Sequence, residues 1–285
     1  YTVETLRRFK LDHEARVFDL TATAKDRDTV PILLKGLIAG RPVDVSNEEM
    51  QSAAAPNYIK KRDLKTIDLT GIPDEPDQAF WATTARAINA KVEAVQEMRT
   101  DAGKALRVSV FGLGPIPLLV HLGARLSDKM DVDLYQLHRN PKSWQWKSGG
   151  GEASYVTNCL AEGESGGDVA LLVNLSGSNS LEVVRAVGLG DSVPVHEITL
   201  SGQETAPTFL NTRDDLKRFI AEYLIVLARI RKEHPPESRL HLFPAVPAPV
   251  AIALGLHRLP KVDPTFVVYD RDKRAGGFTQ TLEIS

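Results

Sequence analysis

A long segment of this chain occurs twice. RVSVFGLGPIPLLVHLGARL begins at Arg107, and RLHLFPAVPAPVAIALGLHRL begins at Arg239. Residues of the first copy recur at a constant spacing of 132, among them the pairs Phe111/Phe243, Pro115/Pro247, Pro117/Pro249 and Gly123/Gly255. Upstream, TIDLTG at 66–71 corresponds to EITLSG at 197–202. A series of this length predicts an internal duplication over about 66–139 and 197–271.

Each copy has the same order of predicted elements: a strand, a long helix, a strand, a helix headed by proline and a strand. The predicted strands are 66–70, 106–111, 132–138, 169–175, 197–202, 240–243, 266–269 and 279–284, and the predicted helices are about 78–100, 115–127, 181–187, 212–233 and 247–257. Strands that alternate with helices favour parallel sheets covered by helices on both faces. The predicted fold class is therefore α/β, with two fused, pseudo-symmetric units.

These patterns divide the chain into three parts: a lead-in over 1–63, a first unit over 64–163 and a second unit over 164–285. Within the lead-in, the apolar run 30–38 is interpreted as a short helix, and the polar stretch 41–57 as a connection. The chain opens at Tyr1, which suggests a piece of a longer protein.

Composition limits the classes of function. The formal net charge is −2, which lacks the basic excess of proteins that grip long nucleic acids, although a small phosphorylated ligand needs only a pocket. A single cysteine, Cys159, excludes a disulfide framework. No charge-free run of 18 residues predicts a membrane span, and no leader is visible, so a cytoplasmic protein is expected.

Loops that follow strands are the predicted ligand site, because ligands of open α/β sheets lie at the carboxyl ends of strands, where helix N-termini point. Small residues there let backbone N–H groups approach a phosphate. The candidates are Gly114, Pro115, Ser176, Ser178, Asn179, Pro244, Ala245 and Pro247. Ordinary turn chemistry is the alternative for each loop.

Aromatic and basic residues supply further candidates. Trp144 and Trp146 lie in a polar segment close to Arg139, where they could stack on bases or pack over a sheet edge. Tyr269 and Arg271 close a predicted strand, and Arg271 could hold a phosphate or form an ordinary surface ion pair.

Catalytic patterns are missing. FGLGPIP has Pro117 where the dinucleotide fingerprint requires glycine, the histidines are scattered, and neither HExxH nor GxSxG occurs. We therefore expect a chain that is not an enzyme and that needs neither cofactor nor metal.

Two phrases carry a resemblance to a known family. HLFPAVPAPVAIALG followed by FVVYDRD, together with YQLHRNPKSWQW, is similar to the SAVED domain, the cyclic-oligonucleotide receptor of bacterial CBASS anti-phage effectors. The resemblance covers about 64–285, and it implies two fused CARF-like, Rossmann-like units, as the duplication also indicates.

The resemblance implies a sensor. A cyclic dinucleotide of the cGAMP kind or a cyclic trinucleotide, made by a CD-NTase, would bind between the two units and contact the candidates named above. Binding would drive self-association and activate a linked effector. The preferred effector is an HNH nuclease on the N-terminal side, and only that effector would contact DNA. The alternatives are a Rossmann-type nucleotide-dependent enzyme that uses Gly112-Leu113-Gly114 and a ring nuclease that degrades the messenger.

Overall fold

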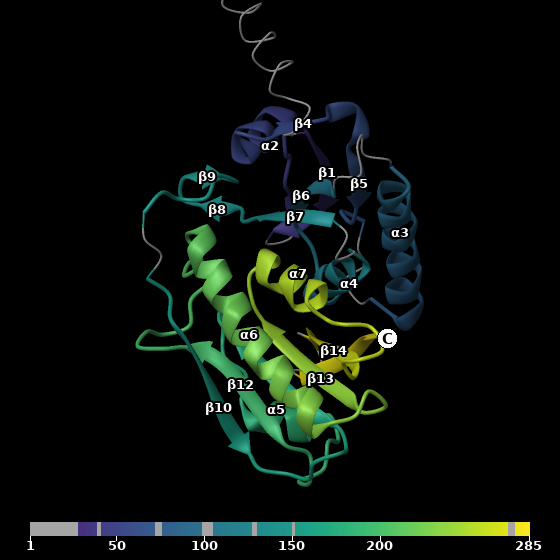
Figure 1. Cartoon of the computed structure of the whole chain (residues 1–285), viewed down its shortest axis with the longest axis vertical. Helices are drawn as coiled ribbons and strands as arrows, with labels where there is room; N and C mark the ends of the chain where they lie inside the picture. The colour runs from purple at the N-terminus through teal and green to yellow at the C-terminus, as the bar shows by residue number, and fades with distance from the viewer. Residues whose placement is uncertain are drawn as a thin grey trace, which may run out of the picture.

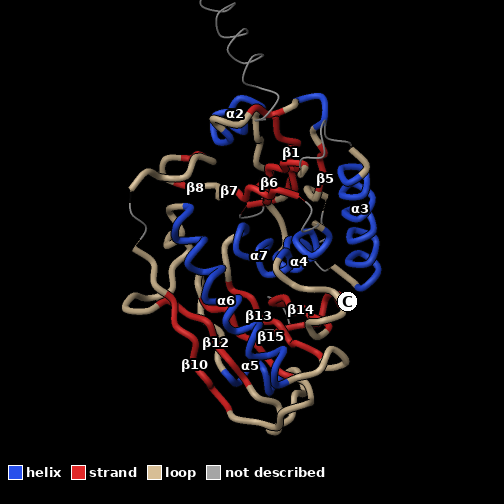
Figure 2. The backbone as a smooth tube through the Cα atoms, viewed as in Figure 1, coloured by secondary structure: helices blue, strands red, loops and turns tan. Residues whose placement is uncertain are grey.

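Two β-sheets with helices between them and outside them make up the protein (Figure 1). The structure is a computed structural model that describes residues 28–38, 41–71, 76–98, 105–126, 130–149, 152–272 and 277–285. In Figure 2 the strands form an upper and a lower group, with helices α4 (Ile116–Arg125) and α7 (Ala248–Leu256) between them.

The first sheet is parallel throughout. Strand β1 (Asp28–Lys35) pairs on one side with β4 (Tyr58–Ile59) at its start and β5 (Lys65–Asp68) at its end. On its other side β1 pairs with β6 (Leu106–Gly112), which pairs with β7 (Met130–Tyr135). β1 is thus a central strand of this sheet.

The second sheet repeats this order and adds a strand at each edge. Its parallel centre runs β12 (Val195–Leu200), β11 (Val169–Asn174), β13 (Arg239–Ala245) and β14 (Thr265–Asp272). The antiparallel strands β10 (Tyr155–Ala161) and β15 (Gly277–Ile284) close the two edges. The order β12–β11–β13–β14 corresponds to β5–β1–β6–β7, so the duplication is confirmed and extends upstream to β1 and β11.

The helices form matching layers. Between the sheets, α3 (Gln78–Gln96) and α4 cover the first sheet, while α6 (Arg213–Glu233) and α7 cover the second, and all four helices share one large core with both sheets. Outside, α2 (Asn47–Ala54) packs on the first sheet and α5 (Leu181–Ala186) on the second, each over a smaller core. Because both faces of the central strands are covered, these strands are almost entirely apolar.

Two glycines let the duplicated halves meet closely. A Cβ atom at Gly123 of α4 would overlap the carbonyl oxygen of Ile252 of α7, and a Cβ atom at Gly255 of α7 would overlap the carbonyl oxygen of Val120 of α4. Each contact is the 132-residue image of the other, so a local pseudo-twofold axis passes between the helices.

The predicted domain boundaries need correction. Residues 28–63 belong to the first sheet through β1 and β4, and β10, assigned to the first unit, pairs with β12 of the second sheet. The run 30–38 is not a helix: β1 is buried on both faces, and its unbroken apolar pattern resembles that of a buried helix. The predicted connection over 41–57 contains α2, which begins with a capping box between Ser46 and Glu49.

The repeated elements follow the prediction closely. The long helices over 78–96 and 213–233 and the proline-headed helices over 116–125 and 248–256 all form. The predicted edge strand over 279–284 is part of β15. Two short antiparallel pairs are also present: β2 (Leu37–Ile38) with β3 (Arg41–Pro42), and the hairpin of β8 (His138–Arg139) with β9 (Lys142–Ser143).

Candidate ligand-binding site

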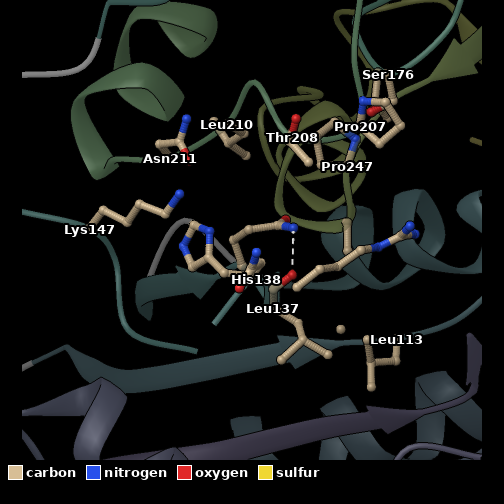
Figure 3. Close-up of a pocket in the computed structure, with 16 residues that line it drawn as sticks. Leu113, Leu137, His138, Lys147, Ser176, Pro207, Thr208, Leu210, Asn211 and Pro247 are labelled. Atoms are coloured by element: carbon tan, nitrogen blue, oxygen red, sulfur yellow. Dashed lines mark hydrogen bonds between the residues drawn. The ribbon is translucent and has the colours of Figure 1, made fainter. Parts of the chain in front are cut away.

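A cavity of about 410 Å³ takes its wall from both units (Figure 3). The first unit contributes Gly112 and Leu113 at the end of β6 and residues 136–140 after β7. The second unit contributes Ser176 after β11, residues from 207–211 after β12, and residues 246–248 at the start of α7. Every one of these segments follows a strand, which is where ligands of parallel α/β sheets bind.

The charged residues in the cavity wall are cationic. Arg139 and Lys147 line the cavity, no carboxylate does, and neither cation forms an ion pair with a described residue. The N-terminus of α7 adds partial positive charge at Pro247 and Ala248. The wall is therefore suited to an anion such as a phosphate group.

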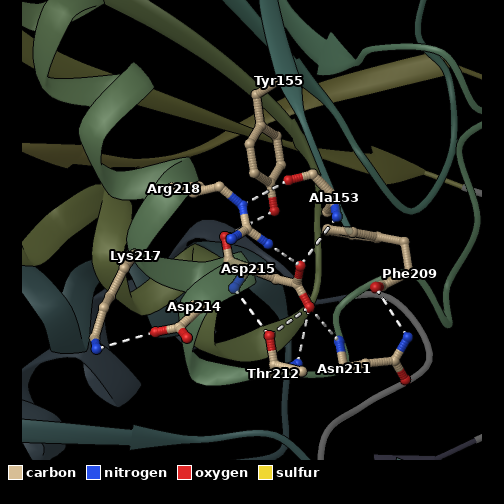
Figure 4. Close-up of polar contacts among 9 residues, drawn as sticks. All are labelled: Ala153, Tyr155, Phe209, Asn211, Thr212, Asp214, Asp215, Lys217 and Arg218. Atoms are coloured by element: carbon tan, nitrogen blue, oxygen red, sulfur yellow. Dashed lines mark hydrogen bonds and ion pairs between the residues drawn. The ribbon is translucent and has the colours of Figure 1, made fainter. Parts of the chain in front are cut away.

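A buried carboxylate holds the 207–211 loop in place (Figure 4). Asp215, 1% exposed, accepts hydrogen bonds from the backbone N–H groups of Thr212 (2.9 Å) and Ala153 (3.0 Å) and from the Arg218 guanidinium (2.6 Å). Burial alone would raise the pKa of Asp215, but hydrogen bonds from the Thr212 hydroxyl and from the backbone N–H groups of Ala153, Thr212 and Asn211 outweigh it and lower the pKa below its ordinary value. The loop is also joined to the first unit, because the Lys147 backbone N–H donates to the carbonyl of Asn211 at 3.1 Å.

Arg213 makes a second connection between the units. It begins α6, and its guanidinium donates to the Asp133 carboxylate at 2.6 Å and to the Tyr135 hydroxyl at 3.2 Å, both on β7. The guanidinium carbon also lies 5.2 Å from the centre of the Tyr135 ring. The cavity wall is thus tied to the first sheet next to the point where β7 ends.

Three of the predicted site residues line the cavity: Arg139, Ser176 and Pro247. They come from a hairpin of the first unit, the loop after β11 and the start of α7, so the fold brings together segments far apart in sequence. Ligand contact by these residues stays a prediction.

The burial of Trp144 contradicts the predicted base platform, and Trp146 lies outside the cavity wall. Trp144 is 1% exposed and packs edge-on against Phe111, with ring centres 5.3 Å apart. Trp146 turns inward as well, and its Nε1–H donates to the carbonyl of Leu134 at 3.1 Å. Trp144 is part of the core on the first sheet, the partly buried Trp146 packs against that core, and neither ring lines the cavity.

Tyr269 and Arg271 lie outside the cavity wall. The Tyr269 ring is buried and stacks on Phe243, with centres 4.4 Å apart, on the face of the second sheet that α5 covers. Its hydroxyl lies 3.0 Å from Nδ1 of His241. Arg271 is exposed near the end of β14, where it pairs with Phe278 of β15.

The remaining candidates flank the cavity without lining it, and their contacts explain why. Asn179 is drawn inward, because its backbone N–H donates to Asn174 at 2.9 Å and its side chain reaches the carbonyl of Phe243. Ser178 contacts Thr205 at 3.1 Å. The others are part of strand β13 or of the entry to α4, and they are Pro244, Ala245, Gly114 and Pro115.

The sequence interpretation missed much of the wall. Gln136, His138 and the 207–211 loop were not selected, although the loop follows a predicted strand and the carboxyl-end rule applies to it equally. Lys147 was overlooked as a ligand contact because it lies nine residues beyond the predicted strand 132–138, in a segment whose path depends on the burial of Trp144 and on the contact of Trp146 with Leu134.

Among the described residues, no group of three or more His, Cys, Asp or Glu side chains could hold a metal ion. In the same part of the chain, no helix has both the length and the apolarity needed to cross a membrane.

Comparison with protein families gave a match over most of the chain. The model for the SAVED family, described as "SMODS-associated and fused to various effectors sensor domain", matches residues 92–284. No significant match was found among curated protein sequences.

Solved structures share the fold. The Acinetobacter baumannii Cap4 SAVED/CARF-domain containing receptor with the cyclic trinucleotide 2′3′3′-cAAA matches with a TM-score of 0.56 and 16% identity, over 90% of this chain and 51% of that chain. The same receptor with 3′3′3′-cAAA gives 0.57 and 14%, over 90% and 52%. The Moraxella osloensis Cap4 receptor gives 0.51 and 14%, over 90% and 50%. This chain therefore spans about half the length of the structures that it matches.

Proposed function

This chain belongs to the SAVED family of sensor domains, and we propose that it binds a cyclic oligonucleotide in the cavity between its two sheets. The observation that carries the proposal is a cavity walled by both units in which the charged side chains, Arg139 and Lys147, are cations without a described ion-pair partner. Such a wall complements the phosphates of a small ring.

The size and shape of the cavity support a small ligand. Its volume of about 410 Å³ lies within the range of roughly 300–1,000 Å³ that is usual for small-molecule sites. Apolar wall residues such as Leu113, Leu210 and Val246 offer surface for sugar and base, while the cations and the α7 N-terminus face phosphate.

The similar receptors indicate which ring to test first. The A. baumannii Cap4 structures hold the cyclic trinucleotides 2′3′3′-cAAA and 3′3′3′-cAAA. We extend that ligand class to this chain, with a cyclic dinucleotide as the second choice. The messenger would come from a CD-NTase in the same cytoplasm.

The proposal includes a response to the ligand. Because both units wall the cavity, a ligand that bridges them would change how α4 and α7, and thus the two sheets, sit against each other. We propose that this change promotes self-association and activates a linked effector nuclease, in keeping with a sensor "fused to various effectors".

Calorimetric titration tests the proposal. Wild-type chain is titrated with 3′3′3′-cAAA, 2′3′3′-cAAA and a cyclic dinucleotide, and at least one of the three is expected to bind. Arg139→Gln and Lys147→Gln should each weaken binding about tenfold, because a hydrogen bond to a charged group contributes roughly 1.5–3 kcal/mol.

Lys217→Gln is the matched control, since Lys217 is an exposed cation of α6 that is absent from the cavity wall. Its affinity should equal that of the wild type. The ligand should be recovered intact by chromatography; a linear product would identify a ring nuclease. Failure of all three rings to bind the wild-type chain would refute the proposal.

A further inference from the structure

Two polar side chains of the cavity wall contain an atom without a partner. Gln136 Oε1 and His138 Nε2 are buried, and neither forms a hydrogen bond with any described residue. His138 as a whole is 7% exposed. Leaving a buried acceptor or donor unpaired costs about 1–3 kcal/mol, so a partner supplied by water or by a ligand in the cavity would stabilise both atoms.

The backbone that carries these side chains is firmly placed. Gln136 directly follows Tyr135, a fully buried ring at the end of β7, and His138 is the first residue of β8 in the β8–β9 hairpin. The His138 ring contacts the Trp146 ring edge-on at 6.0 Å between centres, and Trp146 is itself hydrogen-bonded to Leu134. The Gln136 amide is oriented by the hydrogen bond from its Nε2 to the carbonyl of Leu137, which leaves Oε1 as its unpaired atom.

The chemistry of the pair differs from that of its neighbours. Figure 3 shows the His138 ring in the cavity wall on the same side as Lys147. Burial, and after it the charge of Lys147, lowers the pKa of His138, so the ring is neutral near pH 7. The Gln136 amide is neutral too, and its Nε2 already donates to the carbonyl of Leu137 at 3.0 Å. Neutral groups suit a base edge, whereas the adjacent Arg139 suits a phosphate.

We propose that Gln136 and His138 read a base of the bound ring, with Gln136 Oε1 accepting a hydrogen bond from an exocyclic amino group and His138 pairing with the ring nitrogen beside it. This inference rests on the proposed function and deepens it. Adenine presents that pattern, and a carboxamide is a common partner of adenine. Hypoxanthine presents a carbonyl and an N–H in the same places. Its carbonyl oxygen would then face Gln136 Oε1, and two acceptors cannot form a hydrogen bond with each other.

The experiment compares two rings that differ only at this edge: cyclic tri-adenylate and the analogue with hypoxanthine in place of adenine. Affinities are measured by calorimetry for the wild type, Gln136→Met, His138→Phe and Arg139→Gln. The wild type should prefer the adenylate ring by about tenfold or more. Gln136→Met should bring the ratio of the two affinities close to one, and His138→Phe, which keeps a ring against Trp146, should reduce it.

The ratio distinguishes base reading from a structural role. Arg139→Gln should lower the affinity for both rings by the same factor and leave the ratio of the two affinities unchanged, because Arg139 would contact a phosphate. Equal affinities of the wild type for the two rings, or an unchanged ratio in a folded Gln136→Met variant, would overturn the inference while leaving cyclic-oligonucleotide binding intact. A wild-type chain that binds neither ring would instead refute the proposed function, and the inference with it.

Discussion

Alanine at Gly123 should destabilise the protein, because the contact between α4 and α7 has no room for a side chain. The added Cβ would overlap the carbonyl oxygen of Ile252 and lie 2.9 Å from the backbone nitrogen of Leu256. Backbone atoms cannot rotate aside, so the two helices must separate. Overpacking costs about 1–3 kcal/mol, and the clash with backbone places this case near the upper end.

Alanine also favours a helix over glycine by about 1 kcal/mol, which offsets part of that cost. The expected net loss is about 2 kcal/mol, or roughly 4–8 °C in Tm for a chain of this size. Gly255→Ala should behave alike, since it meets Val120 in the equivalent way. Because a single separation of the helices relieves both clashes, the double variant should lose less than the sum of the two.

Thermal melting followed by circular dichroism measures these losses. Gly167→Ala is the matched control, because a Cβ there meets no atom within 4 Å, and its Tm should stay close to that of the wild type. A Gly123→Ala variant that melts at or above the wild-type temperature would refute the close approach of α4 and α7, and with it the pseudo-twofold contact.

Three further predictions concern stability. Burial, and after it Arg125, lowers the pKa of His121 from 6.5 to about 4, so the unfolded chain takes up a proton that the folded chain refuses, and stability should fall as pH drops through that window. Urea unfolding at about pH 7 and about pH 5 measures how much unfolding free energy is lost on acidification, and His121→Gln should lose less than the wild type. An equal loss in the two proteins would show that His121 is not the cause. Trp144→Ala should cost about 3–5 kcal/mol of unfolding free energy, which a Tm within a degree or so of wild type would contradict. Arg213→Gln and Asp133→Asn should couple by about 0.5–1 kcal/mol in a double-mutant cycle of unfolding, and additive losses would show that the ion pair contributes nothing.

The duplicated helices and strands could be predicted from the sequence, because their hydrophobic periodicity and the order in which they recur are enough to identify them. Helices such as 213–233 show a clear apolar stripe, and the proline pairs mark where α4 and α7 begin. β1 could not be recognised in this way, because a strand buried on both faces loses the alternation that distinguishes it from a helix. Its place in the sheet follows only from the pairings with β5 and β6.

The candidate site was less predictable, for a physical reason. An alternating Trp144-Gln145-Trp146 pattern shows that two rings share a side, but it does not show whether that side is core or solvent. The cavity wall at 207–211 depends on Asp215 and on its contact with Ala153, some sixty residues away. Arg139, Ser176 and Pro247 were found because each follows a strand directly or within a short turn, where local sequence determines position.

The stoichiometry of ligand binding tests the central claim most directly. The cavity takes its wall from both halves of the duplicated fold, so calorimetric titration with a cyclic tri-adenylate should give one ring per chain. The double variant Arg139→Gln/Lys147→Gln should abolish that binding while leaving the Tm unchanged. Two rings per chain would contradict a site shared by the two units, and so would undiminished binding by the double variant.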